Sequence, residues 1–126
     1  MVIIDTNIII DHLRLWSKSE SALDEANKQF STANLALSIV SIQELFVGNS
    51  TRELIIEERI LDLIAPLTLF PYTQEVAKLA GEIIRDINPN MEFADATIAA
   101  TAVLNKAKLL TLNKKDFQGI EKLKLI

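Results

Sequence analysis

Short apolar runs alternate with longer amphipathic segments along the whole chain. The short apolar runs predict strands at 1–5, 35–40, 67–72, 108–113 and 121–126, and the segments between them predict helices at 6–15, 19–30, 41–48, 50–67, 73–87 and 91–107. Only three glycines and three prolines interrupt the pattern, so the turns must be few and short. This order is typical of βαβ units and predicts an α/β fold with a largely parallel sheet.

Length and composition limit the class of protein. We expect one domain over residues 1–126, because a chain of this length with 49% apolar residues can bury a real core. The absence of cysteine excludes disulfides and thiolate metal sites. No run is long enough to span a membrane and the start has no basic leader, so we expect a cytoplasmic protein without a membrane partner. A net charge of −4 argues against broad affinity for nucleic acid, but it does not exclude a nuclease.

The first apolar run, "VIIDTNIII" at residues 2–10, contains an acid. Burying a carboxylate costs several kcal/mol unless the charge is paired or bound to a metal. Asp5 could simply begin a turn or cap the following helix. However, Thr6 or Asn7 is also available as the cap, so we expect Asp5 to have another partner.

Two further acids have both a structural and a functional interpretation. Glu44 fits a capping box with Ser41, but it also follows the second predicted strand. Asp95 lies in the first turns of an alanine-rich helix, where an acid favours the helix dipole. Glu92 already satisfies the dipole, whereas Asp95 shares its face with small apolar residues, namely Ile98, Ala99 and Ala102. We therefore interpret Asp95 as a functional residue.

The predicted topology brings these side chains to one edge of the sheet. Asp5, Glu44 and Asn113 each follow a strand, and the helix of Asp95 precedes the fourth strand. Ligand sites in parallel sheets lie beyond the carboxyl ends of the strands. Several oxygen ligands without cysteine or histidine suit a hard cation, so the sequence predicts a site for Mg²⁺ or Mn²⁺.

The chain resembles the PIN-domain family, and within it the VapC-type toxin ribonucleases of type II toxin–antitoxin systems. The resemblance covers nearly the whole chain and is carried by "IIDTNIIID" at 3–11, "SIVSIQELFVG" at 38–48 and "FADATIAATAVLNKAKLLTLNKKDF" at 93–117. It implies a three-layer α/β/α fold with a mostly parallel central sheet of four or five strands. It also implies a Mg²⁺- or Mn²⁺-dependent endoribonuclease toxin that cleaves single-stranded RNA, with a cognate antitoxin and a homodimer.

The resemblance assigns roles to individual residues. It makes Asp5, Glu44 and Asp95 both catalytic residues and metal ligands, and it matches Thr6 to a hydroxyl position near the metal-bound water. Many members carry a further acid where this chain has Asn113. Asp116 is the nearest substitute but lies three residues later, which weakens the case for a second metal.

The expected chemistry is hydrolysis of a phosphodiester bond by a metal-activated water, leaving 5′-phosphate and 3′-hydroxyl ends by resemblance. A metal-free mechanism usually needs two acid–base groups, and His12 is the single histidine. A phosphatase with an aspartyl nucleophile commonly has a second aspartate two residues later, where this chain has Asn7. A catalytically weak PIN-like module that only binds RNA or a protein remains the alternative.

Candidate contacts to RNA and partners are more general. The candidate RNA-binding cations are Arg14, Lys18, Arg52, Lys114 and Lys115, although a solvated surface role is the common one for each. Trp16 or Phe46 could stack on bases, but we favour packing for both. Apolar stripes should belong mostly to the core, with the remainder forming a homodimer seam or an antitoxin groove; they comprise Leu13, Leu15, Trp16, Ile55, Ile56, Ile60, Leu63 and Ile64.

Overall fold

The five predicted strands form one parallel sheet. The computed structural model describes all residues from 1 to 126, and its strands follow the order β3-β2-β1-β4-β5. Every neighbouring pair is parallel, as the sequence predicted. The strands are β1 (Val2–Ile4), β2 (Leu35–Ser38), β3 (Thr68–Phe70), β4 (Lys108–Leu110) and β5 (Lys124–Leu125).

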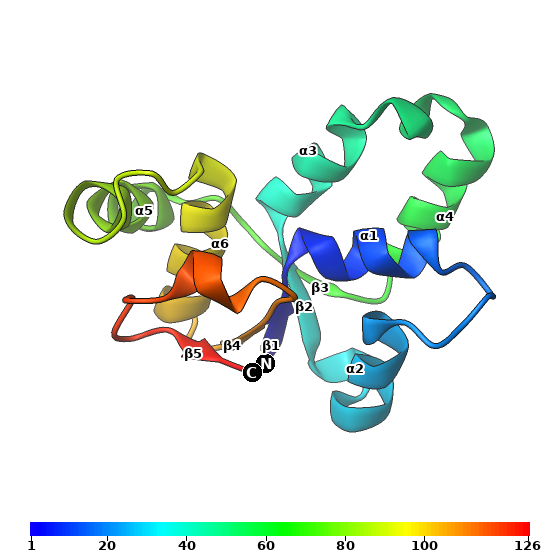
Figure 1. The fold of residues 1–126 in the computed structure, drawn as a ribbon, viewed down its shortest axis with the longest axis horizontal. Coiled ribbons are helices and arrows are strands. Elements are labelled where there is room, and N and C mark those ends of the chain that lie inside the picture. The colour runs from blue at the N-terminus through cyan, green and yellow to red at the C-terminus, as the bar shows by residue number, and fades with distance from the viewer.

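Six α-helices connect the strands and leave the sheet in the middle layer (Figure 1). They are α1 (Thr6–Arg14), α2 (Ala22–Phe30), α3 (Ile39–Val47), α4 (Leu54–Ile64), α5 (Gln74–Asp86) and α6 (Phe93–Leu104). Short 3₁₀ segments complete the chain at η1 (Thr32–Asn34), η2 (Asn49–Arg52) and η3 (Lys114–Phe117). No helix has the length and apolar character needed to cross a membrane.

Each face of the sheet carries its own apolar cluster, which gives the three layers that the resemblance implied. On one face, Ile3, Ala36 and Leu109 pack with residues of α5 and α6. On the other, alternate strand residues pack with α1, α2 and α4, so Val2 and Ile4 point away from Ile3. The predicted inner face of α6 is fully buried, and its alanines let the helix lie close to the sheet.

Two helix caps differ from the prediction, and both differences involve site residues. Asp5 itself is the N-cap of α1, because its carboxylate accepts from the backbone N–H of Thr6; Thr6 and Asn7 already lie inside the helix. α3 starts at Ile39 with Ser38 as its cap, two residues before the predicted start of this helix. The capping box between Ser41 and Glu44 is therefore wrong, and both side chains are free for other contacts.

Candidate active site

Asp5 is fixed at the carboxyl end of β1 by three hydrogen bonds. Its backbone N–H donates to the carbonyl of Leu110 on β4 (2.9 Å). Its Oδ1 accepts from the N–H of Thr6 and its Oδ2 from the hydroxyl of Thr111, both at 2.7 Å. The side chain is only 5% exposed, and this burial raises the pKa of Asp5 while the two hydrogen bonds act in the opposite direction. Asp5 is therefore a helix cap and a buried carboxylate at once.

Thr111 connects the end of β4 to the start of α1. Besides donating to Asp5, its hydroxyl oxygen accepts from the N–H of Asn113 (3.0 Å) and from Nδ2 of Asn7 (3.4 Å). The Oδ1 of Asn7 accepts in turn from the N–H of Leu112 (3.3 Å). Thr111 falls within the predicted strand 108–113, and the structure shows it as a buried hydroxyl that orients Asp5. Its position just after a strand, beside that of Asp5, was the available signal.

Thr6 links Asp5 to Glu44 on α3. The hydroxyl of Thr6 donates to Oε1 of Glu44 (2.6 Å) and lies 2.8 Å from the hydroxyl of Ser41. Glu44 and Ser41 are one turn apart on α3 and face α1 together. Burial raises the pKa of Glu44, the bond from Thr6 opposes this, and the negative charges of Asp5 and Glu92 raise it further. Ser41 is thus a site neighbour that its assumed capping role concealed.

Asp95 approaches from the opposite side, in the first turn of α6. The side chain is half-buried, and this burial, followed by repulsion from Asp5 and Glu44, raises its pKa to about 7. No hydrogen bond from the protein opposes that shift. The structure therefore brings Asp5, Glu44 and Asp95 into each other's electric field at the carboxyl edge of the sheet.

Two exposed acids flank Asp95. η3 turns the chain so that Asp116 lies with Asp95 and Glu92 around a pocket of about 170 Å³, which Asn88, Asn90 and Met91 complete. Asp116 adds to the raised pKa of both Asp5 and Asp95. Asn113 is exposed, and its backbone rather than its side chain contacts Thr111. Asp116 therefore reaches the acidic group despite its displacement along the sequence.

The donor set fits a hard divalent cation. All the available ligands are oxygens. Asp95 accepts no hydrogen bond from the protein, so its carboxylate oxygens are free to bind a cation. No three acidic or histidine side chains are close enough to form a finished metal site in this structure. Like charges resist closer approach unless a cation lies between them. The carboxylates thus converge without touching.

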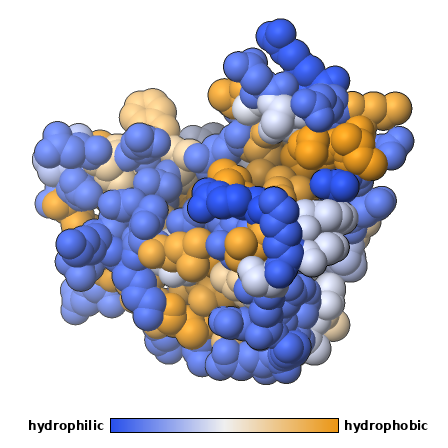
Figure 2. All heavy atoms as spheres, turned by 45° about the vertical axis from the view of Figure 1, so that its right-hand side comes forward, coloured by the Kyte–Doolittle hydropathy of each residue, from blue (hydrophilic) through white to orange (hydrophobic).

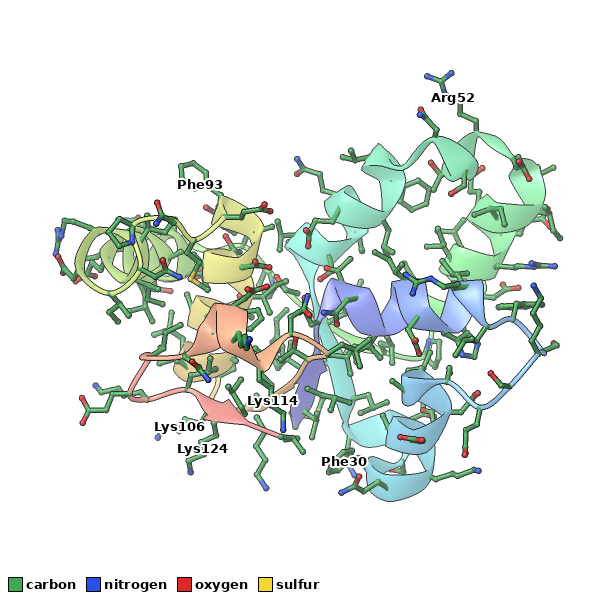
Figure 3. The ribbon with its side chains drawn as sticks, viewed as in Figure 1. Phe30, Arg52, Phe93, Lys106, Lys114 and Lys124 are labelled. Atoms are coloured by element: carbon green, nitrogen blue, oxygen red, sulfur yellow. The ribbon has the colours of Figure 1, made fainter.

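The basic residues predicted to bind RNA differ in their position relative to these acids. Lys114 and Lys115 line a hollow of about 630 Å³ together with Thr111 and Asp116, so they adjoin the site. Arg52 lies at the tip formed by η2 and projects away from the molecule (Figure 3). Arg14 and Lys18 are exposed in the last turn of α1 and in the loop after it.

The predicted aromatic and histidine residues have packing roles. The guanidinium of Arg59 covers the ring of Trp16, 4.4 Å from its centroid, and the ring of His12 meets Trp16 edge-on at 5.4 Å. Nδ1 of His12 is hydrogen-bonded to the hydroxyl of Ser21 (2.6 Å). Phe46 packs against the cluster under α1, α2 and α4. The expectation that His12 is structural agrees with these contacts.

Comparison with known proteins gives the same family as the sequence motifs. Ribonuclease VapC10 of Mycobacterium tuberculosis is 32% identical over 98% of this chain and 91% of its own length. FitAcB of Neisseria gonorrhoeae superposes with a TM-score of 0.81 over 100% of this chain and 96% of its own, at 18% identity. VapBC2 of Rickettsia felis, solved with a promoter DNA fragment, gives a TM-score of 0.78 over 100% and 98%, at 19% identity. These two structures share the fold. The model of the PIN domain matches residues 2–123, and the chain belongs to the PIN-domain family.

Proposed function

We propose that this protein is a metal-dependent endoribonuclease that hydrolyses phosphodiester bonds of single-stranded RNA. The observation that carries the proposal is the convergence of Asp5, Glu44 and Asp95 at the carboxyl edge of the sheet, where Asp95 has a pKa of about 7 and no protein donor. The similarity to a ribonuclease over 98% of the chain supports the same reaction.

Asp5, Asp95 and Glu44 are the residues that would hold Mg²⁺ or Mn²⁺. A bound cation of this kind supplies an activated water and neutralises phosphate charge. Thr111 and the N–H of Thr6 keep the Asp5 carboxylate in one orientation, so Asp5 needs little reorganisation on binding. Thr6 holds one oxygen of Glu44 and leaves the other available to orient a water or accept its proton.

Single-turnover cleavage of a labelled single-stranded RNA in Mn²⁺ tests the reaction. We expect no cleavage in EDTA and no cleavage by Asp95→Ala. The control Asp86→Ala changes an exposed acid that is paired with Arg85, and it should cleave at the wild-type rate. Undiminished cleavage in EDTA would remove the metal mechanism. Asp5→Asn separates binding from folding, because asparagine caps helices as well as aspartate does. Calorimetry should show weaker Mn²⁺ binding by this variant, which stays folded because the cap remains, although the amide that faces Thr111 no longer accepts its hydrogen bond.

A catalytically weak binding module is the second candidate, and Asn113 favours it because many family members carry an acid there. The same assay separates the two functions. Equal, background-level rates for the wild type and Asp95→Ala would favour the inert module. A clear difference between them would favour the enzyme.

We further propose that the protein is the toxin of a cytoplasmic toxin–antitoxin pair. Two of its structural relatives belong to toxin–antitoxin systems: a complex from Klebsiella pneumoniae (TM-score 0.75, 24% identity, 100% and 96% coverage) and VapBC-5 of Mycobacterium tuberculosis (TM-score 0.68, 20% identity, 98% and 95% coverage). Ile60 and Ile64 are core residues, but α3 and α4 leave a group of apolar side chains exposed, comprising Val47, Leu54, Ile55 and Leu61. Figure 2 shows apolar surface just below the hydrophilic tip of this region.

This apolar surface is the area we assign to an antitoxin segment or to a second copy of the chain. Co-expression with the protein encoded by the neighbouring reading frame, followed by size-exclusion chromatography, tests the assignment. Leu54→Ser should weaken a complex that uses the surface, whereas Leu112→Ser, an exposed apolar residue near β4, should not.

A further inference from the structure

Positive charge is concentrated in the last sixth of the chain. Residues 106–126 contain six lysines and two acids, whereas residues 1–105 contain seven basic and fifteen acidic residues. All six lysines are exposed, and the four ion pairs of the structure involve none of them. A protein with a net charge of −4 thus carries one strongly basic segment, which comprises Lys106, Lys108, Lys114, Lys115, Lys122 and Lys124.

Two of these lysines lie directly beside each other on the sheet. Lys108 of β4 and Lys124 of β5 are register partners on parallel strands, so their side chains leave the same face of the sheet. Like charges in such a position destabilise strand pairing. The repulsion makes this a favourable place for an anion to bind.

Helices do not cover this part of the sheet. Leu109 and Leu125 point to the cluster under α5 and α6, so Lys108 and Lys124 point to the opposite face. On that face, α1, α2 and α4 pack over β1 and β2, and no residue of β4 or β5 is fully buried there. Figure 3 shows Lys106 and Lys124 projecting from the same edge of the molecule. We call Lys106, Lys108 and Lys124 the lysine face.

The lysine face is continuous with the candidate active site. β4 runs from Lys108 towards Thr111, and three residues of strand span about 10 Å. Thr111 donates to Asp5, and beyond it Lys114 and Lys115 line the hollow that Asp116 also borders. Exposed lysines therefore lie both on the open sheet face and, after the end of β4, beside the acids.

We propose that the lysine face binds the phosphate backbone of the RNA strand whose scissile bond lies among the acids. The inference rests on the proposed function and adds the surface that holds the substrate. Lysine binds phosphate as a point charge and does not read bases, so this contact is independent of sequence. It explains how a protein of net negative charge holds a polyanion beside a group of carboxylates.

Salt-dependent RNA binding tests the lysine face. The affinity of a fluorescein-labelled single-stranded RNA is measured by anisotropy in EDTA, which keeps the RNA intact. We compare the wild type with Lys108→Gln/Lys124→Gln and with the matched control Lys78→Gln/Arg85→Gln on α5, which changes the net charge equally. Each lost phosphate contact should lower the slope of log K against log salt by about 0.7, so the lysine-face pair should lose about 1.4 while the control keeps the wild-type slope.

Each other outcome has a distinct meaning. An unchanged slope in a folded lysine-face variant would overturn the inference even if the wild type cleaves RNA. A reduced slope in a protein that cleaves no RNA would overturn the nuclease proposal and support RNA binding by the lysine face. Binding of fluorescein-labelled polyglutamate is measured in the same way. If the lysine-face variant loses binding of polyglutamate but binds RNA as the wild type does, the partner of the lysine face is an acidic protein segment and not RNA. Lys106→Gln/Lys124→Gln repeats the test if the first pair lowers the melting temperature.

Discussion

The two sides of the candidate active site are built in different ways. On the strand side, Asp5 is almost fully buried, and two hydrogen bonds hold its oxygens. On the helix side, Asp95 is half-buried and accepts no hydrogen bond from the protein, and the charges that act on it are those of other acids. Both carboxylates are desolvated, but only Asp5 is compensated by the protein.

In the proposed metal site, Asp5 is a preorganised ligand, whereas only the cation would compensate the charge of Asp95. The hydrogen bonds to Asp5 favour its charged form and oppose the burial penalty. For Asp95 no hydrogen bond or positive charge of the protein opposes that penalty, and its pKa is therefore raised. We therefore expect changes on the helix side to affect metal-dependent activity most, and changes on the strand side to affect folding stability most.

Asp95→Asn should have the largest effect. We expect the rate of RNA cleavage in Mn²⁺ to fall about 100-fold or more, which corresponds to roughly 3 kcal/mol of barrier, because a metal ligand is lost. The free energy of unfolding without metal should stay constant or rise at neutral pH, because a desolvated charge among like charges disappears. Single-turnover rates and denaturant titrations measure the two effects. A stable variant that cleaves at the wild-type rate would remove Asp95 from the active site.

Thr111→Val should have the next largest effect, this time on stability. Valine keeps the shape but leaves Oδ2 of Asp5 and the N–H of Asn113 without their partner, so we expect a loss of about 1–3 kcal/mol. Thr101→Val is the matched control, because this equally buried hydroxyl donates only to the carbonyl of Thr97 within α6. Urea denaturation in EDTA compares them. Equal losses in the two variants would mean that the hydroxyl of Thr111 has no special role in holding Asp5.

The sequence alone predicts most of the fold and the identity of the acids. Short apolar runs and helical spacing place the strands and helices to within a few residues, because a strand covered on both faces is apolar throughout and a helix covered on one face has an apolar stripe. The expected meeting of residues 5, 44 and 95 follows from topology, since the carboxyl ends of parallel strands share an edge.

Side-chain partners are harder to predict, because they depend on contacts distant in the chain. The cap of α1 is an example: the sequence offered Asp5, Thr6 or Asn7, and the structure selects Asp5, which also accepts from Thr111, 106 residues away. Ser41 fits a local motif, yet its hydroxyl lies against Thr6. The return of Asp116 to the acids depends on η3, whose 3₁₀ turn has no strong periodic signal in four residues.

The stability of the metal-free protein should fall as pH rises from about 4 to 7. The pKa of Asp95 is about 7 in the folded state against 3.8 as a free side chain, so in this window the folded protein holds a proton that the unfolded chain has released. The free energy of unfolding therefore decreases with pH, and the raised pKa values of Asp5 and Glu44 act in the same direction. Because Asp95 is partly exposed, we expect a decrease of about 1–2 kcal/mol.

Denaturant titrations in EDTA at several pH values measure this dependence. Asp95→Asn should flatten the curve, since the titrating group is gone. Mn²⁺ should oppose the decrease, because the cation binds the deprotonated carboxylates. Stability that increases from pH 5 to pH 7 in EDTA would contradict the raised pKa of Asp95.

Asn7→Ala should have the smallest effect, and it separates the orientation of Asp5 from its presence. Asn7 makes two long hydrogen bonds, to Thr111 and to the N–H of Leu112, so we expect a loss of only about 0.5–1 kcal/mol. The bond from Thr111 to the cap residue Asp5 remains, but the end of β4 loses its two contacts with Asn7 inside α1. Mn²⁺ affinity measured by calorimetry should weaken more than the stability does, because the strand side loses part of its preorganisation. Asn105→Ala, which removes one hydrogen bond to Thr101 at the far end of α6, should change stability by a similar amount and leave Mn²⁺ affinity unchanged. If both variants bind Mn²⁺ as the wild type does, the contacts of Asn7 serve the fold alone, and Thr111 is sufficient to orient Asp5.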